Sequence, residues 1–188
     1  VSRKTQQIPV VAAITAQRPE PKMVKIQGLM NPGGSTGVKG LVTNDVWKVY
    51  LDEKASSWAT ANVNLSPGLK VDPKKCARVT FEANRLPDAW GEYHDHATPQ
   101  FKMNGRDANG KLAFGNWVVP HHISNGSPFY RTDNNPDTWE KVYIGAREAN
   151  FIPEWYTQII SIALQFQVMP SEHSGLEMRN FVIEEVNE

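Results

Sequence analysis

The chain has 188 residues, and its 20 basic and 20 acidic side chains give a formal net charge of zero. This balance argues against binding to nucleic acid or to an anionic membrane surface, because both partners attract a basic excess. No apolar run approaches the ~20 residues of a membrane-spanning helix. Cys76 is the only cysteine, so no internal disulfide can form. We expect Cys76 to be a small buried residue rather than a nucleophile.

The chain divides into an N-terminal extension or edge strand over residues 1–22 and a β-sandwich domain over residues 23–188. Ile8–Ile14 contains Pro9, which an edge strand tolerates, and Arg18–Pro21 reads as an extended connector. One short helical turn is expected within Asp52–Thr60 or Glu148–Tyr156. Turns rich in Gly, Pro and Asn separate the predicted strands, which are Val24–Met30, Asp45–Leu51, Ala59–Leu65, Ala77–Arg85, Pro99–Asn104, Lys111–Val119, Trp139–Ala146, Ile159–Met169 and Leu176–Val186.

Two of these strands alternate strictly between apolar and other residues, which predicts one buried face. Over residues 160–168 the apolar set is Ile160, Ile162, Leu164, Phe166 and Val168, and the outward set is Ser161, Ala163, Gln165 and Gln167. Over residues 77–84 the expected inward set is Ala77, Val79, Phe81 and Ala83. In the last strand the phase breaks near Arg179-Asn180, which indicates a β-bulge. About nine short strands predict an all-β, antiparallel β-sandwich of the jelly-roll type.

Three features follow one another in the last third of the chain. Thr138 and Glu140 flank Trp139, the long alternating strand Ile160–Val168 comes next, and Asn180-Phe181-Val182-Ile183-Glu184 lies in the final strand. This order, over residues 24 to 188, resembles the carbohydrate-binding modules with a galactose-binding-like β-sandwich. The resemblance implies non-catalytic carbohydrate binding in a bacterial polysaccharide-degrading system, at a secreted, periplasmic or cell-surface location. It also implies an attached or partner catalytic domain, no required cofactor, and a structural Ca²⁺ of the kind common in such modules.

Aromatic residues in polar loops are the first candidates for sugar binding, because flat rings stack on the C–H face of a sugar. The common alternative is that such rings close the ends of the core. Trp47 and Trp139 lie in strands with apolar neighbours and are expected to be structural, whereas Trp58 stays undecided. The stacking candidates are Trp90, Tyr93, Trp117, Tyr130 and Trp155.

Outward polar residues of the predicted strands are the second group of candidates. Amide, carboxylate and guanidinium groups can hydrogen-bond the hydroxyl rim of a sugar. The neighbouring amides Gln165 and Gln167 favour a surface for a neutral polar ligand, although an ordinary solvated sheet face is the alternative. The set that could line one concave face is Arg78, Glu82, Asn84, Lys102, Asn104, Gln165 and Gln167.

Two motifs bear on metal binding, and neither defines a ligand set. His94-Asp95-His96 could be joined by Asp88 or Glu92, with His121-His122 as a third ligand only if the loops meet; a solvated polar loop is the commoner outcome. Asp133-x-Asn135-x-Asp137 matches the first oxygen positions of a calcium loop, but it lacks the following Gly and the distal Glu. An Asx-turn is the expected role of this second motif.

Enzyme signatures are absent from the sequence: it has no Gly-x-Ser-x-Gly elbow, no His-Glu-x-x-His and no Gly-rich phosphate loop. No strand carries two carboxylates in the manner of a retaining glycosidase, although Glu82 could meet Glu140 or Asp95 in the fold. A binding module is therefore favoured over an enzyme. One alternative is a jelly-roll assembly or capsid-type protein with Val1–Lys22 as a swapped arm. The other is a β-sandwich glycoside hydrolase or polysaccharide lyase whose acid/base is Tyr93, His94 or His96.

Overall fold

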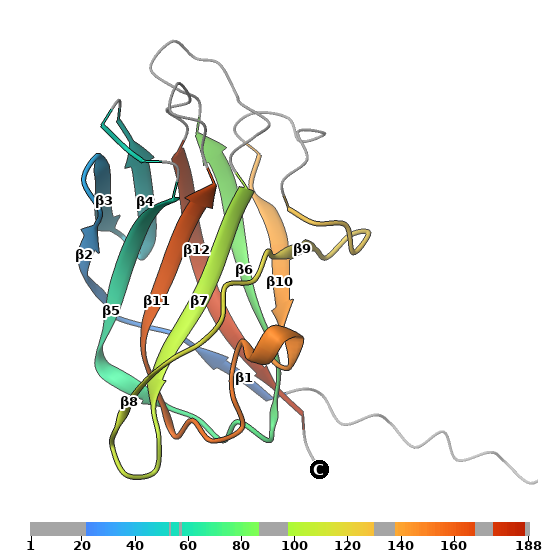
Figure 1. The fold of residues 1–188 in the computed structure, drawn as a ribbon. Coiled ribbons are helices and arrows are strands. Elements are labelled where there is room, and N and C mark those ends of the chain that lie inside the picture. The colour runs from blue at the N-terminus through green and yellow to red at the C-terminus, as the bar shows by residue number, and fades with distance from the viewer. Residues whose placement is uncertain are drawn as a thin grey trace, which may run out of the picture.

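The computed structural model describes residues 22–52, 54–56, 58–86, 98–129, 138–167 and 175–186, which form two antiparallel sheets packed face to face (Figure 1). Sheet A runs β3 (Val38–Thr43), β4 (Val46–Leu51), β12 (Gly175–Glu185), β6 (Cys76–Leu86), β10 (Glu140–Gly145) and β9 (His121–His122), and β1 (Lys22–Lys25) also pairs with β12. Sheet B runs β2 (Leu29–Gly34), β5 (Trp58–Lys70), β11 (Gln158–Gln167), β7 (Thr98–Arg106) and β8 (Leu112–Phe114). The predicted all-β sandwich of antiparallel sheets is confirmed.

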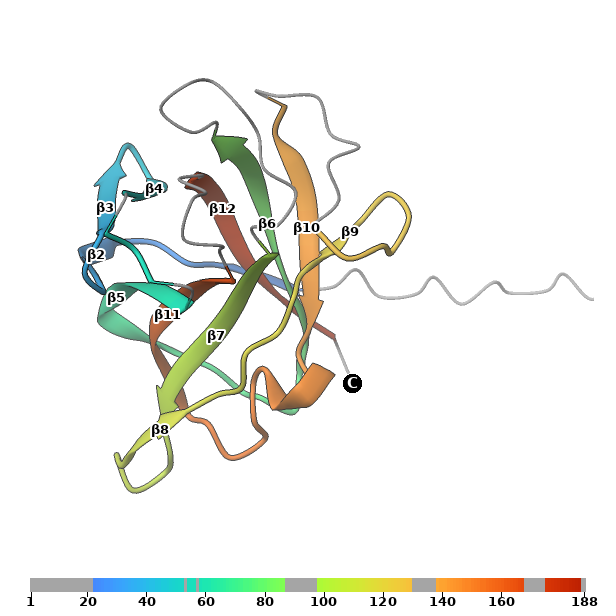
Figure 2. The ribbon, with the colours of Figure 1, turned by 45° about the horizontal axis from the view of Figure 1, so that its top comes forward.

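The hydrophobic core fills the space between the two sheets, whose layers are seen from above in the tilted view of Figure 2. Phe81 of β6 is at its centre, with ring centroids 4.8 Å from Phe101 of β7 and 4.8 Å from Phe181 of β12. Trp47 of β4 is fully buried in the same core, which confirms its structural role. Because the core is formed by the inner faces of both sheets, the outer face of each sheet does not take part in core packing.

The N-terminal strand is divided where the sequence predicts one continuous run, Val24–Met30. Gly28 has a φ of +72°, a conformation that side-chain-bearing residues rarely adopt. This turn separates β1, which pairs in sheet A, from β2, which pairs in sheet B. Three elements differ from the expectation in other ways: β3 and β9 are short edge strands that were not predicted, and the predicted strand Lys111–Val119 is reduced to β8 plus a bridge from Val118 to Phe101.

Two predicted alternations hold in the middle of their strands and shift at one end. In β11 the register changes between Ile159 and Ser161, so Ile159 is buried and Ile160 is only half-buried. At the start of β6 the register with β12 also changes, and Cys76 is buried instead of Ala77. The predicted bulge in the last strand is confirmed, because the pairing with β6 shifts between Arg179 and Val182.

Three smaller expectations can be compared with the structure. Cys76 is buried as expected, and burial raises the pKa of its thiol to about 11, so it is protonated at neutral pH. The helical content of the described residues is one 3₁₀ turn, η1 (Glu148–Asn150), which lies in the second of the two predicted positions. No helix in the described part of the chain is long and apolar enough to cross a membrane. Apart from Lys22, the predicted N-terminal extension lies outside the described residues.

Candidate functional site: the outer face of sheet B

The outer face of sheet B presents rows of polar side chains from its three central strands. Residues paired directly across antiparallel strands point to the same face, so the register gives the map of this surface. One side of each row comes from β5, the middle from β11 and the other side from β7. The rows are Thr60–Gln165–Gln100, Asn62–Ala163–Lys102 and Asn64–Ser161–Asn104.

The centre of this face has short side chains, and two of its polar groups are hydrogen-bonded to each other. Ala163 is 1% exposed, yet its paired neighbours Asn62 and Lys102 place it on the outer face and not in the core. Next to it, Asn104 Nδ2 donates a hydrogen bond of 3.0 Å to Ser161 Oγ. Small and mutually bonded side chains in the middle leave the longer amides around them to contact a ligand. The surface is therefore preformed, which reduces the entropy lost on binding.

Aromatic side chains frame the face at two opposite corners. Trp58 begins β5 and is 49% exposed, and Phe114 ends β8 and is 65% exposed. Phe114 is in the same row as Asn104 of β7, and Trp58 is in the same row as Thr98, which lies six residues before Asn104 in that strand. The two corners are therefore separated by three strand spacings, ~14 Å, and by ~20 Å along the strands. In the strand order of sheet B, β11 and β7 lie between β5 and β8.

Trp117, a predicted stacking residue, lies at the β8 edge of this face. The backbone of Val118 exchanges two hydrogen bonds with Phe101, which places Trp117 beside Lys102. Lys102 Nζ is 4.4 Å from the Trp117 ring centroid and 5.7 Å from the Phe114 ring centroid. The half-buried indole therefore has a cation over one of its faces, an arrangement that attracts the ammonium to the ring.

The charge distribution of this face is unusual for a sheet surface. In the rows from Trp58 to Asn64, Lys102 is the single charged side chain among the residues whose side chains are described. Burial lowers the pKa of Lys102 below its ordinary value. The remaining outward groups are amides, hydroxyls and a methyl, all of which are neutral at every physiological pH.

The structure divides the predicted polar set between opposite sides of the sandwich. Lys102, Asn104 and Gln165 lie on sheet B, and Gln167 is in β11, with its side chain outside the described part. Arg78, Glu82 and Asn84 lie on β6 in sheet A. The expectation that all seven line one face is therefore wrong, because alternation places these β6 side chains on the outer side of the other sheet.

The three β6 residues are bonded to neighbours on their own sheet. Arg78 pairs with Glu184, with Nη2 3.3 Å from Oε1. Asn84 is buried, and its Nδ2 donates to Glu177 Oε1 at 2.9 Å. Glu82 accepts hydrogen bonds from Arg179 Nε at 3.1 Å and from Asn180. Their role in ligand binding stays a prediction; what the structure shows is a set of side chains that stabilise one another.

Glu82 and Glu140 do not form the carboxylate pair of a glycosidase. Glu140 is paired with the core-facing Ala83, whereas Glu82 is paired with Lys141, so the two carboxylates belong to opposite faces of sheet A. Partial burial alone would raise the pKa of Glu82, but hydrogen bonds from Asn180 and Arg179 outweigh it and hold this pKa below its ordinary value. A general acid needs a raised pKa, so Glu82 does not fit that role.

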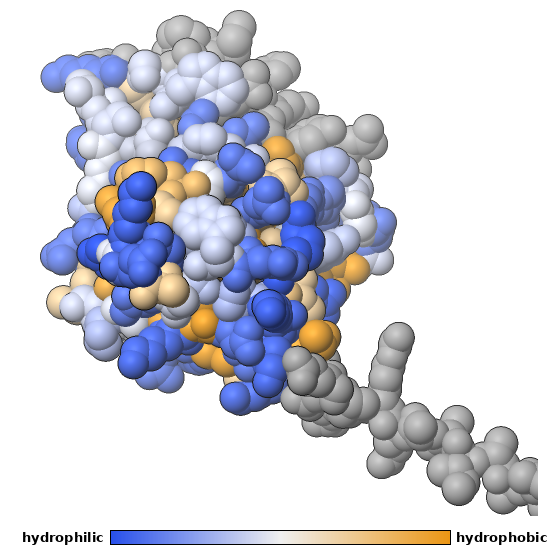
Figure 3. Space-filling model, turned by 60° about the horizontal axis from the view of Figure 1, so that its bottom comes forward, coloured by the Kyte–Doolittle hydropathy of each residue, from blue (hydrophilic) through white to orange (hydrophobic). Residues whose placement is uncertain are grey.

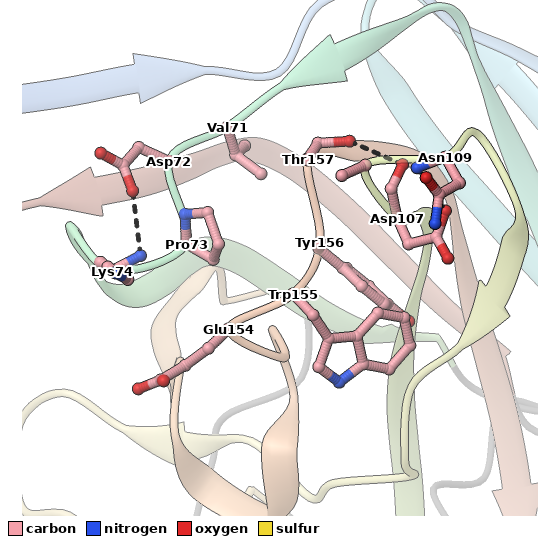
Figure 4. A pocket seen from close by; sticks show the side chains of 11 residues that line it. Val71, Asp72, Pro73, Lys74, Asp107, Asn109, Glu154, Trp155, Tyr156 and Thr157 are labelled. Atoms are coloured by element: carbon pink, nitrogen blue, oxygen red, sulfur yellow. Dashed lines mark hydrogen bonds between the residues drawn. The ribbon is translucent and has the colours of Figure 1, made fainter.

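Trp155 lies in a different place, beside the β7–β8 turn and the residues that follow β5. The space-filling view from below the sandwich shows hydrophilic side chains alternating with small apolar patches (Figure 3). Trp155 is 53% exposed and lines an open pocket of about 710 Å³. Figure 4 shows its indole next to the Tyr156 ring, with the β7–β8 turn on one side. The nearby carboxylates serve local turns: Asp107 Oδ1 accepts from the backbone of Asn109 and Lys111 at 2.9 Å each. Trp58 is paired with Gln167 at one end of β11, whereas Trp155 comes three residues before Gln158 at the other end, so the two indoles are too far apart to share a short ligand.

The remaining predicted site residues include some that the structure does not describe. Trp139, just before β10, is half-buried beneath the guanidinium of Arg179 at 3.9 Å, in keeping with a structural role.

His121 and His122 contact Glu148 and Glu140 at 2.9 Å and 2.5 Å. In the described ranges no three His, Cys, Asp or Glu side chains gather as a metal site. Outside the described residues are Asp88, Trp90, Glu92, Tyr93, His94, Asp95, His96, Tyr130, Asp133, Asn135 and Asp137.

Sequence reasoning missed half of this face, although a signal was present. The run Trp58-Ala-Thr-Ala-Asn-Val-Asn-Leu65 alternates as strictly as the Gln165 strand, and its outward residues are also uncharged. Two alternating strands of this kind, both with amides outward, could have been assigned to one surface. Phe114 has no comparable signal, because β8 is only three residues long and its pairing with β7 depends on the fold.

Solved carbohydrate-binding modules have the same fold. The family 11 module from Clostridium thermocellum, in complex with a β-1,3-1,4-mixed-linked tetrasaccharide, is 12% identical, with a TM-score of 0.50 over 90% of this chain and 98% of that chain. The xylan-binding module of family 15 is 10% identical, with a TM-score of 0.50 over 89% and 99% of the two chains. A family 30 module is 9% identical, with a TM-score of 0.50 over 87% and 99%.

These similarities concern the fold, because identities this low say nothing about individual ligand contacts. No family model and no curated protein sequence matches the chain. The structural neighbours nonetheless cover most of both chains, so the match is to the whole sandwich and not to a shared fragment. The β-sandwich expected from the resemblance is confirmed: this chain has the fold of a carbohydrate-binding module.

Proposed function

We propose that this chain is a non-catalytic module that binds a polysaccharide along the outer face of sheet B. The observation that carries the proposal is the preformed face of amides and hydroxyls framed by the exposed rings of Trp58 and Phe114. Amides and hydroxyls can donate to and accept from the equatorial hydroxyls of sugars, and the rings fit their C–H faces.

The dimensions of the face favour a chain of several sugars over a single monosaccharide. The two aromatic corners are too far apart, ~14 Å across the strands and ~20 Å along them, for one ring to contact both. A polysaccharide that runs diagonally over the amide rows would contact both corners and the residues between them. The family 11 neighbour was solved with a tetrasaccharide and the family 15 neighbour is a xylan-binding module, which supports a glycan chain as ligand.

Binding without chemistry fits the residues on this face. Most glycoside hydrolases use a pair of carboxylates on either side of the scissile bond. None of the described outward residues in the rows from Trp58 to Asn64 is a carboxylate. The module would instead raise the local concentration of an attached or partner enzyme on its polysaccharide, as expected for a secreted degradation system.

Native-gel affinity electrophoresis with soluble polysaccharides, followed by calorimetry on the strongest ligand, tests this proposal. Trp58→Ala and Phe114→Ala should each weaken binding about tenfold, ~1.4 kcal/mol, because each removes one stacking contact. Thermal unfolding should change little, since both rings are about half exposed or more.

Two exposed aromatics elsewhere provide matched controls. Tyr50→Ala removes a ring that is 41% exposed on sheet A, and Trp155→Ala removes the indole in the end pocket. Both variants should bind as the parent does. Retained affinity in the Trp58 and Phe114 variants together with a loss in either control would move the site, and Trp90→Ala would then test the remaining sequence-based candidate. No retardation by any polysaccharide would remove the proposed function.

A further inference from the structure

Lys102 is a half-buried cation in the middle of the sheet B face, and none of the carboxylates that the structure describes is paired with it. Its ammonium is over the rings of Trp117 and Phe114, at 4.4 Å and 5.7 Å from their centroids. Throughout the described ranges, no carboxylate lies within ion-pair distance of Lys102 Nζ and no oxygen accepts a hydrogen bond from it. The ammonium is therefore held in one place by the rings and keeps its donor capacity for another group.

The outer face of sheet A shows that this chain normally pairs such cations. Three half-buried basic residues lie there, and each has a carboxylate on a neighbouring strand. Lys48 Nζ is 3.3 Å from Glu177, Arg179 Nε is 3.1 Å from Glu82, and Arg78 pairs with Glu184. Partial burial of a positive charge costs free energy unless a negative charge compensates for it. At Lys102 no carboxylate of the described residues compensates for the charge in this way.

Contacts with aromatic rings do not replace that missing charge. A ring quadrupole attracts an ammonium, but it carries no net negative charge and is a poorer acceptor for the N–H groups than a carboxylate oxygen. Burial correspondingly lowers the pKa of Lys102, with no partner that raises it. Asn62 and Asn104 are close by on the same face, so a group bound at Lys102 would have amides beside it for neighbouring hydroxyls.

We propose that the polysaccharide bound by this face carries an anionic group, a uronic acid carboxylate or a sulfate ester, and that Lys102 binds this group. The inference rests on the proposed function, and it names the class of glycan. The anion would supply the ion-pair partner that the described residues do not provide, while neutral sugars on either side occupy the amide rows and the aromatic corners. Affinity for the acidic glycan then depends on salt, because part of its attraction is between charges.

Pairs of polysaccharides that differ only in charge test this inference. Glucuronoxylan and polygalacturonate are compared with their carboxyl-reduced forms, and a sulfated galactan is compared with its desulfated form. The parent protein should bind one charged form about tenfold more tightly than its neutral counterpart, a difference typical of one charge-assisted hydrogen bond. The pair that shows the difference distinguishes a carboxylate from a sulfate.

Variants separate the role of charge from the role of packing. Lys102→Met keeps the apolar stem and removes the charge, so it should abolish the preference for the charged form over the neutral form. Lys102→Arg should restore most of the preference. Lys141→Met is the control, because it makes the same change in net charge on the outer face of sheet A, at the position paired with Glu82.

Each result has one meaning. Equal affinity of the parent for charged and neutral forms overturns the anionic class while leaving glycan binding intact. Equal loss of both forms in Lys102→Met, with its thermal unfolding unchanged, also overturns it and makes Lys102 a donor to a hydroxyl. A protein that binds no member of any pair but is retarded by another, neutral polysaccharide overturns this inference alone. A protein that binds no polysaccharide at all refutes the proposed function, and with it this inference.

Discussion

The two outer faces of the sandwich are built on the same alternation but satisfy their polar groups differently. On sheet A the outward side chains pair with one another: Glu177 bonds both Asn84 and Lys48, and Glu82 bonds both Arg179 and Asn180. On sheet B the outward side chains are mostly neutral, and Lys102, the one described charge in its central rows, forms no ion pair with a carboxylate that the structure describes.

This difference indicates which of the two faces can contribute more free energy to ligand binding. A side chain that already has an intramolecular partner must lose that partner before it can bind a ligand. A face whose side chains pair with one another therefore contributes little free energy to binding. A face of amides and solvated rings loses only water, and burial of its aromatic area on binding is favourable. The alternation that makes a strand amphipathic is therefore the same on both faces, and the choice of outward residues separates a structural face from a binding face.

The largest change that we expect is a loss of polysaccharide affinity when the aromatic residues of sheet B are removed. The double variant Trp58→Ala/Phe114→Ala should weaken polysaccharide binding about a hundredfold, ~2.7 kcal/mol, because the rings are far enough apart for their contributions to add. Calorimetry measures the affinity, and circular dichroism follows the melting temperature. A melting temperature lowered by more than about 10 °C would mean that these rings support the core and not a ligand.

The next effect, on the sheet A side, should appear in stability and not in binding. Arg179 is stacked on Trp139 at 3.9 Å and bonded to Glu82 at 3.1 Å, so Arg179→Ala should lower the free energy of unfolding by about 1–2 kcal/mol. Lys39→Ala is the control, because its ion pair with Asp52 is long, 3.9 Å, and exposed. Denaturant titration measures both. Weaker polysaccharide binding by Arg179→Ala would contradict the separation of the two faces.

A smaller effect should appear as pH dependence on sheet A. The folded protein holds the pKa of Glu82 below its ordinary value, so the ionised carboxylate stabilises the fold above the pKa of an unfolded glutamate, ~4.3. That contribution should be lost as pH falls through the lower, folded-state pKa. We expect Glu82→Gln to reduce stability at pH 7 by about 1 kcal/mol or less and to flatten the acid limb of the unfolding curve. Glu154→Gln, at an exposed residue of the end pocket, should leave that limb unchanged.

The smallest effect concerns the stability contribution of Lys102. Its folded-state pKa is lowered, which means that folding disfavours its charged form at every pH below that pKa. This penalty is relieved as pH rises from the folded-state pKa toward that of an unfolded lysine. Lys102→Met should therefore leave the free energy of unfolding at pH 7 unchanged or slightly raised, whereas Lys48→Met, which breaks the pair with Glu177, should lower it. A clear loss of stability in Lys102→Met would show that the ammonium has a structural partner.

Much of the fold was predictable because alternation is a local property of the chain. Ile162, Leu164 and Phe166 are buried as their spacing predicts, and the bulge near Asn180 follows from a break in the same spacing. The end positions were less predictable, because Ile159 and Cys76 are buried through register shifts that depend on the partner strand. The division of β1 from β2 depends on which sheet each half joins, which a continuous apolar run does not reveal.

The sequence by itself determined that this is a β-sandwich with amphipathic strands, because period-two alternation directs side chains to one face or the other without reference to any distant residue. It also identified amides on the Gln165 strand as a candidate binding feature. Only the tertiary structure decided which strands are neighbours: it separated Arg78, Glu82 and Asn84 from Gln165 and joined Trp58, Lys102 and Phe114 on one surface. The physical reason is that a face is shared through hydrogen-bonded pairing between strands far apart in the chain, and the pattern within one strand does not encode its partner.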